Sequence, residues 1–142
     1  MKILVINGPN LNMLGIRQPE IYGKATYSDL LEFIKKHCEG KVEVEFYQSN
    51  HEGDIIDKIQ AARGVFDGIV LNAGGYTHTS VAIADAIPAS EVPTAEVHIS
   101  DITKREPFRH HSYLTPVCVV SIMGKGFNGY TEAIDYIINM YK

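Results

Sequence analysis

The sequence lacks most features that mark secreted, membrane or metal-binding proteins. Its 142 residues include only two cysteines, Cys38 and Cys118, which lie far apart in a predicted helix and a predicted strand. Two such thiols form neither a disulfide framework nor a cysteine-ligated zinc or iron site, so both are expected to be buried and reduced. No apolar run approaches the roughly 20 residues that span a bilayer, and no membrane partner is expected.

The sequence also lacks an excess of basic residues and any pair of histidines at metal-binding spacing. The formal net charge is −4 and the pI about 5.8, which argues against nucleic acid or an anionic membrane as a partner. The six histidines include no His-x-His or His-x-x-x-His pair, so we expect no bound metal. A strand pattern starts at Lys2 and leaves no room for a signal peptide, which favours the cytoplasm.

The sequence does contain alternating strand and helix patterns. Apolar residues make up 45% of the chain, as in a globular protein. Strands are predicted over residues 2–6, 42–48, 69–71, 94–99 and 117–123, and helices over 26–39, 55–62, 81–87 and 130–141, with Pro88 ending the third helix. Strands that alternate with helices indicate a parallel α/β sheet with right-handed crossovers.

The order of the strands follows from their exposure. Val42, Val44 and Phe46 alternate with charged residues, as in a half-exposed strand at the edge of a sheet. The run Ile69–Leu71 is continuously apolar and belongs in the middle. Of the two common doubly wound arrangements, the order 2-1-3-4-5 fits best, with residues 1–142 forming a single domain.

In this topology, three strand ends converge on one edge of the sheet, where open α/β sheets bind ligands. Two connections, residues 7–24 and 100–115, are longer than simple connectors need to be. Many of the chain's reactive side chains fall there: Asn7, Asn10, Asn12, Arg17, Tyr22, Asn72, His78, His98, Ser100, Asp101, Arg105 and Arg109. The sequence therefore predicts a functional site at this edge.

Each of these residues also has a structural interpretation. A single histidine that ends a strand, as His98 does, is more often a hydrogen-bonded core residue than a catalyst. Tyr22 taken alone is typical of an ordinary loop aromatic, and Arg17 and Arg109 of solvated charges. The pair His110-His111 is more typical of loop packing than of a metal site.

Other functions for the same fold are less well supported. Residues Gly124 to Gly129 are glycine-rich, but they lack the order of a phosphate-binding loop and follow the last strand, so they predict a turn. A flavin or nucleotide module needs a phosphate cradle after the first strand, where Pro9 removes an N–H group. A receiver-type or scaffold domain needs clustered acidic residues there, and the sequence has none.

Five motifs, at residues 7–15, 17–23, 71–80, 96–100 and 108–112, together resemble the type II 3-dehydroquinate dehydratases over the whole chain. The resemblance implies a flavodoxin-like fold and the conversion of 3-dehydroquinate to 3-dehydroshikimate and water, by anti elimination through an enolate. It implies no cofactor or metal. The pathway would be shikimate and aromatic amino acid biosynthesis or quinate breakdown, and the assembly a homododecamer built from trimers.

The resemblance also implies roles for individual residues. Tyr22 would act as the base in its phenolate form, with Arg17 favouring that form. His98 would act as the acid, oriented by Glu96, and Asn10 would hold a water against the enolate oxygen. The remaining substrate contacts would come from Ile99 and Ser100 at the carboxylate, from Asn72, His78 and Arg109 at the ring hydroxyls, and from Asp85 across a subunit contact.

Several positions depart from the usual family pattern. Ala73 stands where proline is common and Gly75 where alanine is common, and these changes are expected to loosen the loop that follows the central strand. Asp101 replaces a common asparagine and adds negative charge near an anionic substrate. Gln18 and Pro107 stand where glutamate is frequent. None of these changes removes a residue that the family uses for chemistry, so they bear on affinity more than on activity.

Overall fold

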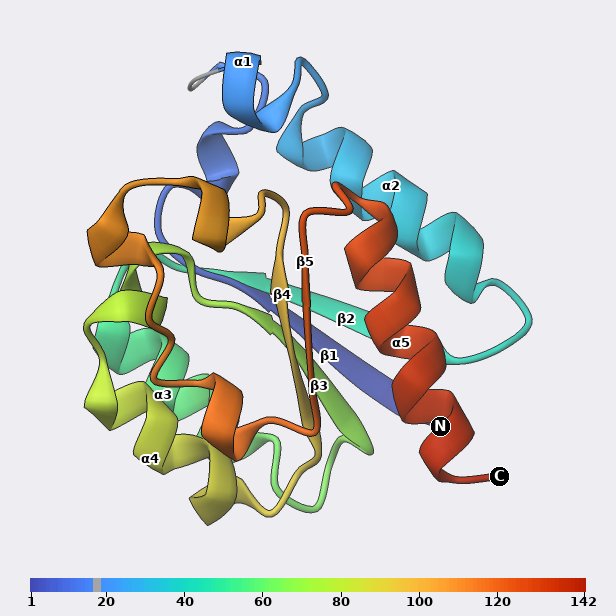
Figure 1. Ribbon diagram of the computed structural model, residues 1–142. Helices are drawn as coiled ribbons and strands as arrows, with labels where there is room; N and C mark the ends of the chain where they lie inside the picture. Colours follow the sequence, from blue (N-terminus) through green and yellow to red (C-terminus); the bar gives the residue numbers. More distant parts are fainter. Residues whose placement is uncertain (17–18) are drawn as a thin grey trace.

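Five parallel strands form one sheet in the order β2-β1-β3-β4-β5 (Figure 1). The computed structural model describes residues 1–16 and 19–142, except for the side chains of Ile21 and Tyr22. The strands are β1 (Lys2–Asn7), β2 (Glu43–Gln48), β3 (Gly68–Asn72), β4 (Thr94–His98) and β5 (Val120–Met123). The predicted doubly wound, flavodoxin-like arrangement is confirmed.

Helices cover both faces of the sheet. On one face lie α2 (Tyr27–Cys38) and α5 (Asn128–Met140), and on the other α3 (Glu52–Ala61) and α4 (Val81–Ser90) (Figure 1). Because side chains alternate along a strand, β1 contributes Ile3 and Val5 to the first core and Leu4 and Ile6 to the second. This double burial explains why β1 is continuously apolar.

Local signals in the sequence set where two helices begin. Thr26 caps α2: its hydroxyl accepts a hydrogen bond from the Asp29 N–H, and the Asp29 carboxylate accepts one from the Thr26 N–H. Ser80 starts α4 by accepting a hydrogen bond from the Ile83 N–H at its hydroxyl. The edge position predicted for the second strand is also confirmed.

Several predicted boundaries differ from the observed ones by a few residues, and two of these differences have a clear physical cause. Pro88 does not end the third predicted helix, because α4 continues to Ser90, whose hydroxyl donates a hydrogen bond to the Ile87 carbonyl. Pro88 has no N–H group and so removes one hydrogen bond of the helix, but burial of Ile87 and Ser90 holds the last turn. The fifth strand begins at Val120, because Thr115–Val117 forms a 3-10 turn that contains Pro116.

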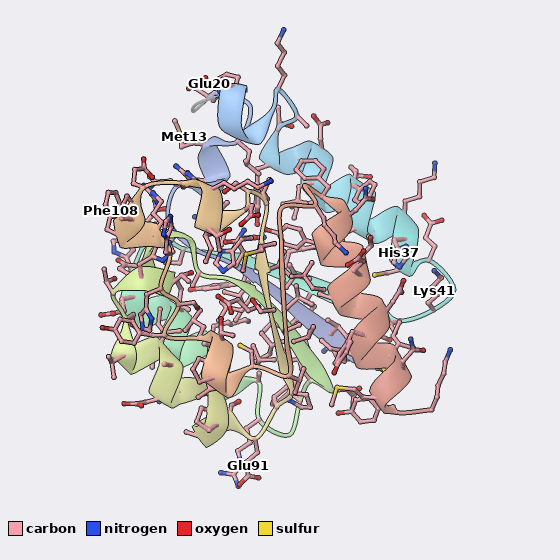
Figure 2. All side chains as sticks on the ribbon, viewed as in Figure 1. Met13, Glu20, His37, Lys41, Glu91 and Phe108 are labelled. Atoms are coloured by element: carbon pink, nitrogen blue, oxygen red, sulfur yellow. The ribbon has the colours of Figure 1, made fainter. Side chains whose placement is uncertain are left out.

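The two long connections lie over the carboxyl ends of the strands (Figure 1). The first contains η1 (Leu11–Met13) and α1 (Pro19–Tyr22), and the second η3 (Ile102–Lys104) and η4 (Pro107–Arg109). Met13, Glu20 and Phe108 mark this end of the molecule in Figure 2, opposite Glu91. Among the described residues, no helix combines the length and apolar character needed to cross a membrane.

Candidate active site

A cavity of about 120 Å³ opens where β1, β3 and β4 end. It brings together seven of the ten predicted site residues: Asn10, Asn72, His78, His98, Ile99, Ser100 and Arg109. Pro9, Leu11, Gly74, Gly75, Ile102 and Arg105 complete the lining. The cavity therefore brings together most of the site residues that were predicted at the ends of these three strands.

Three predicted residues are not placed at the cavity. Arg17 lies outside the described residues, and of Tyr22 only the backbone is described, at the last position of α1. The roles of these two residues remain predictions. Asp85 is exposed on α4 and does not line the cavity of its own chain.

A buried carboxylate holds His98. Glu96 and His98 are two residues apart on β4 and therefore lie on the same face of the sheet. The Nε2 atom of His98 donates to Glu96 Oε2 over 2.6 Å, and Glu96 has no solvent exposure. This contact leaves His98 Nδ1 as the nitrogen available to a ligand. The same pairing of a carboxylate with a histidine fixes the imidazole and stabilises its protonated form in many acid–base catalysts.

Hydrogen bonds keep Glu96 ionised despite its burial. Burial raises the pKa of this carboxyl, but hydrogen bonds from His98, Ser112 and Thr115 outweigh that effect and bring the pKa to about 2. Ser112 Oγ and Thr115 Oγ1 each lie 2.5 Å from a Glu96 oxygen. Neither of these two donors was predicted from the sequence. The sequence did contain a signal for these donors, because a glutamate inside a buried strand requires hydrogen-bond partners.

His78 is fixed as a neutral hydrogen-bond acceptor. Its Nδ1–H donates to the His111 carbonyl over 2.8 Å, so Nε2 carries the free lone pair. Burial lowers the pKa of His78, and this effect exceeds the opposing effect of the hydrogen bond to His111. The His78 and His98 rings stack with 6.5 Å between their centroids. The cavity thus holds one imidazole suited to accept from a hydroxyl beside one paired with a carboxylate.

A buried network of hydrogen bonds holds the Asn72 side chain in place. Its Nδ2 donates to Tyr130 Oη over 2.9 Å, and its Oδ1 accepts from the Gly74 N–H over 3.2 Å. Tyr130 Oη in turn donates to Asn7 Oδ1 over 2.6 Å, and burial raises the pKa of Tyr130, so that it stays a phenol. Each polar atom of the Asn72 amide thus has one described partner, which leaves one N–H group and one oxygen lone pair for a ligand.

Glycines allow the first and third strand exits to approach closely. A Cβ on Gly8 would lie 2.6 Å from the Ala73 carbonyl oxygen, and one on Gly74 would lie 2.9 Å from the Pro9 carbonyl oxygen. Gly74 also has a φ of +59°, in the left-handed region. Gly75 differs, because its φ is not positive and a Cβ there would meet nothing within 4 Å.

Alanine at these two adjacent glycines should therefore change stability in opposite directions. Gly75→Ala restores the residue common in the family and should raise the free energy of unfolding by about 0.4–1 kcal/mol by restricting the unfolded chain. Gly74→Ala should lower it by at least about 1–2 kcal/mol, the cost of a left-handed alanine. Urea unfolding of both variants measures this. Equal effects would contradict the environments described for the two glycines.

Two arginines make the cavity attractive to an anion. Arg109 Nε donates to Glu106 Oε2 over 2.8 Å, and Arg105 Nε lies 3.8 Å from the same oxygen. Arg105 also lines the cavity; it was among the reactive side chains expected at this edge but was assigned no role toward a substrate. Asp101 does not line the cavity, and its carboxylate accepts hydrogen bonds from Thr103.

The glycine-rich turn that follows β5 supports the end of β4 and the residue after it. The Gly124 N–H donates to the His98 carbonyl, and the Gly126 N–H donates to the Ile99 carbonyl. The predicted turn is therefore present, and its N–H groups hold the chain where it leaves β4. The N–H groups of Ile99 and Ser100 donate to no other described residue, so both are available to a ligand. Among the described residues, no cluster of three or more metal-ligating side chains occurs.

Comparison with known proteins identifies relatives over nearly the full length. The family model for class II dehydroquinase matches residues 1–138. A 3-dehydroquinate dehydratase of Fusobacterium nucleatum is 56% identical, covering 99% of each chain, and a catabolic 3-dehydroquinase of Aspergillus oryzae is 50% identical, covering 99% of this chain and 92% of the relative. The crystal structure of type II dehydroquinase from Butyrivibrio crossotus superposes with a TM-score of 0.94 at 55% identity, covering 96% of this chain and 97% of that one.

Proposed function

Because the chain belongs to the class II dehydroquinase family, we propose that it converts 3-dehydroquinate to 3-dehydroshikimate and water as a single catalytic domain. One observation supports this most directly: the His98–Glu96 pair opens into a cavity that also offers two arginines and the free N–H groups of Ile99 and Ser100. An acid–base pair beside an anion site suits a substrate that carries both a carboxylate and a leaving hydroxyl.

The elimination needs a base, an enolate stabiliser and an acid. In the proposed mechanism, the Tyr22 phenolate removes a proton from the carbon next to the ketone and produces an enolate. The protonated His98 then gives its Nδ1 proton to the departing hydroxyl, which leaves as water. Glu96 accepts from Nε2 throughout, so His98 is returned to the neutral tautomer that carries its proton on Nε2.

Substrate orientation follows from the hydrogen-bonding capacity of the lining groups. Ser100 and the N–H groups of Ile99 and Ser100 would bind the carboxylate, because backbone donors and the arginines favour an anion. Asn72 would donate to a ring hydroxyl and His78 Nε2 would accept from one, which fits the tautomer described above. Arg109 would contribute a further donor to the hydroxyls.

Asn10 is suited to hold a water near the enolate oxygen. It lines the cavity in a left-handed conformation with a φ of 70°, and its own N–H is anchored by Asn50 Oδ1 over 3.0 Å. Its side-chain amide makes no hydrogen bond to another described residue. A preorganised donor aimed at developing negative charge is a common way to stabilise such an intermediate.

Mixing the purified protein with 3-dehydroquinate should produce the absorbance of a conjugated enone, without added metal or nucleotide. Activity should survive exhaustive dialysis against EDTA, because the proposed steps move only protons. Borohydride added with substrate should not inactivate the enzyme, since no lysine Schiff base is involved. A substrate adduct on any lysine in the mass spectrum, or activity that zinc restores after EDTA, would contradict this mechanism.

We also propose a homo-oligomer in the cytoplasm, with trimers assembled into a dodecamer. Asp85 supports this proposal, because a residue proposed to contact substrate is exposed on α4 and does not line the cavity of its own chain. Such a residue can reach the cavity of a neighbouring subunit. Light scattering of the active protein tests the assembly, and a fully active monomer would contradict it.

A further inference from the structure

Two hydroxyl groups outside the proposed catalytic set converge on Glu96. Ser112 Oγ donates to Glu96 Oε2 and Thr115 Oγ1 donates to Glu96 Oε1, each over 2.5 Å, while His98 Nε2 also donates to Oε2. Both oxygens of the carboxylate are therefore engaged. A buried carboxylate without such donors would be protonated, since desolvation disfavours its charged form.

The direction of the Ser112 hydroxyl is determined by its neighbours. Ser112 Oγ accepts hydrogen bonds from the N–H groups of Leu114 and Thr115, over 3.1 and 3.3 Å. These two donors occupy the lone pairs of the oxygen, so its proton points to Glu96. The backbone turn at residues 112–115 thus orients a donor at the carboxylate that holds His98.

The same segment also contacts the second histidine of the cavity. The His111 carbonyl accepts from His78 Nδ1, and the Tyr113 N–H donates to the Thr77 carbonyl over 3.0 Å. Residues 111–115 are therefore tied both to η2 (Gly74–His78) and to β4. This double attachment holds the two hydroxyls in place against Glu96.

We propose that Ser112 and Thr115 are positioning residues that keep Glu96 ionised and thereby hold His98 with Nδ1 directed at the substrate. They act through Glu96 and touch no substrate. This inference rests on the proposed function only for its effect on turnover, because the ionisation of Glu96 is a property of the free protein.

Among the described residues, the titratable groups that interact with Glu96 are His98 on the same strand, His78 on η2 and the Cys118 thiol that follows η5. Burial, followed by the Glu96 charge, raises the pKa of Cys118 to about 12, so this thiol stays neutral and contributes no counter-charge. Removing both hydroxyls therefore leaves His98 as the one remaining hydrogen-bond donor to Glu96 among the described residues.

The test compares Thr115→Val, Ser112→Ala and the double variant with Thr103→Val. The control removes a threonine hydroxyl that donates to an exposed carboxylate, that of Asp101, over 2.6 Å. The ¹³C shift of the Glu96 carboxyl, followed from pH 4 to 8 in the free enzyme, reports its ionisation. We expect an ionised signal throughout in the wild type and the control, and a protonation step within this range in the double variant.

Turnover provides the second measurement. The kcat of the double variant should fall roughly 10–100-fold, by analogy with the loss of outer-shell partners of metal-bound histidines, with KM changed less than threefold. A Glu96 carboxyl that stays ionised from pH 4 to 8 in the double variant would overturn the proposal. If that variant does not fold, Thr115→Val decides alone, and a Glu96 signal that titrates as in the wild type would overturn the proposal. If the wild type lacks dehydratase activity, the carboxyl titration still tests the role of the two hydroxyls.

Discussion

Replacement of His98 by glutamine is expected to lower kcat by roughly 10²–10⁴-fold, the usual contribution of a positioned general acid. The KM should change only a few-fold, because the proton is needed by the departing hydroxyl and not by the bound substrate. Loss of transition-state stabilisation without loss of binding lowers kcat and kcat/KM equally. Steady-state kinetics with 3-dehydroquinate measure both constants.

Glutamine is preferred to alanine because of Glu96. Alanine at position 98 would remove the 2.6 Å donor from the fully buried Glu96 carboxylate, and the loss of a hydrogen bond to a buried charge is destabilising even with Ser112 and Thr115 in place. The amide of glutamine can still donate to Glu96 but cannot transfer a proton at neutral pH. His51→Gln, at an exposed histidine before α3, is the matched control. A His98→Gln enzyme with normal kcat and a raised KM would reassign His98 to substrate binding.

Tyr22→Phe is expected to abolish most turnover, because the proposed base is removed. A free tyrosine has a pKa near 10 and is almost entirely phenol at neutral pH. A guanidinium about 4 Å from the phenolate, at an effective dielectric near 20, contributes roughly 4 kcal/mol. That energy favours the ionised form by about 10³-fold, so Arg17 would lower the pKa of Tyr22 toward the working range.

The pH dependence of Arg17→Ala tests this assignment. Without the guanidinium the phenolate is scarce at neutral pH, so turnover should fall heavily, and the residual kcat should rise with pH as the unassisted tyrosine ionises. Arg63→Ala is the control, because Arg63 is an exposed arginine whose partner, Glu91, lies at the opposite end of the molecule from Phe108 (Figure 2). An Arg17→Ala enzyme with the wild-type pH profile would mean that another group, with Arg109 the first candidate, supports Tyr22.

The sequence by itself determined the class of fold and most of the elements. Period-2 and helical patterns are local, and burial on both faces appears directly as the continuous apolar run of β1, so the strand order could be inferred from the chain alone. The sequence predicted the first and last residues of the helices and strands less accurately. The end of α4 was misjudged because packing of Ile87 and Ser90 outweighs the local helix-breaking signal of Pro88, and the start of β5 was misjudged because residues 115–117 form a 3-10 turn.

The sequence also identified the candidate site, since the polar residues after β1, β3 and β4 had to meet at one edge. Only the tertiary structure decided how those side chains are held. Asn72 depends on Tyr130, 58 residues away, and Glu96 on Ser112 and Thr115, 16 and 19 residues away. Such partners are selected by distance in space and by the need to satisfy buried polar groups, and neither leaves a periodic trace in the chain.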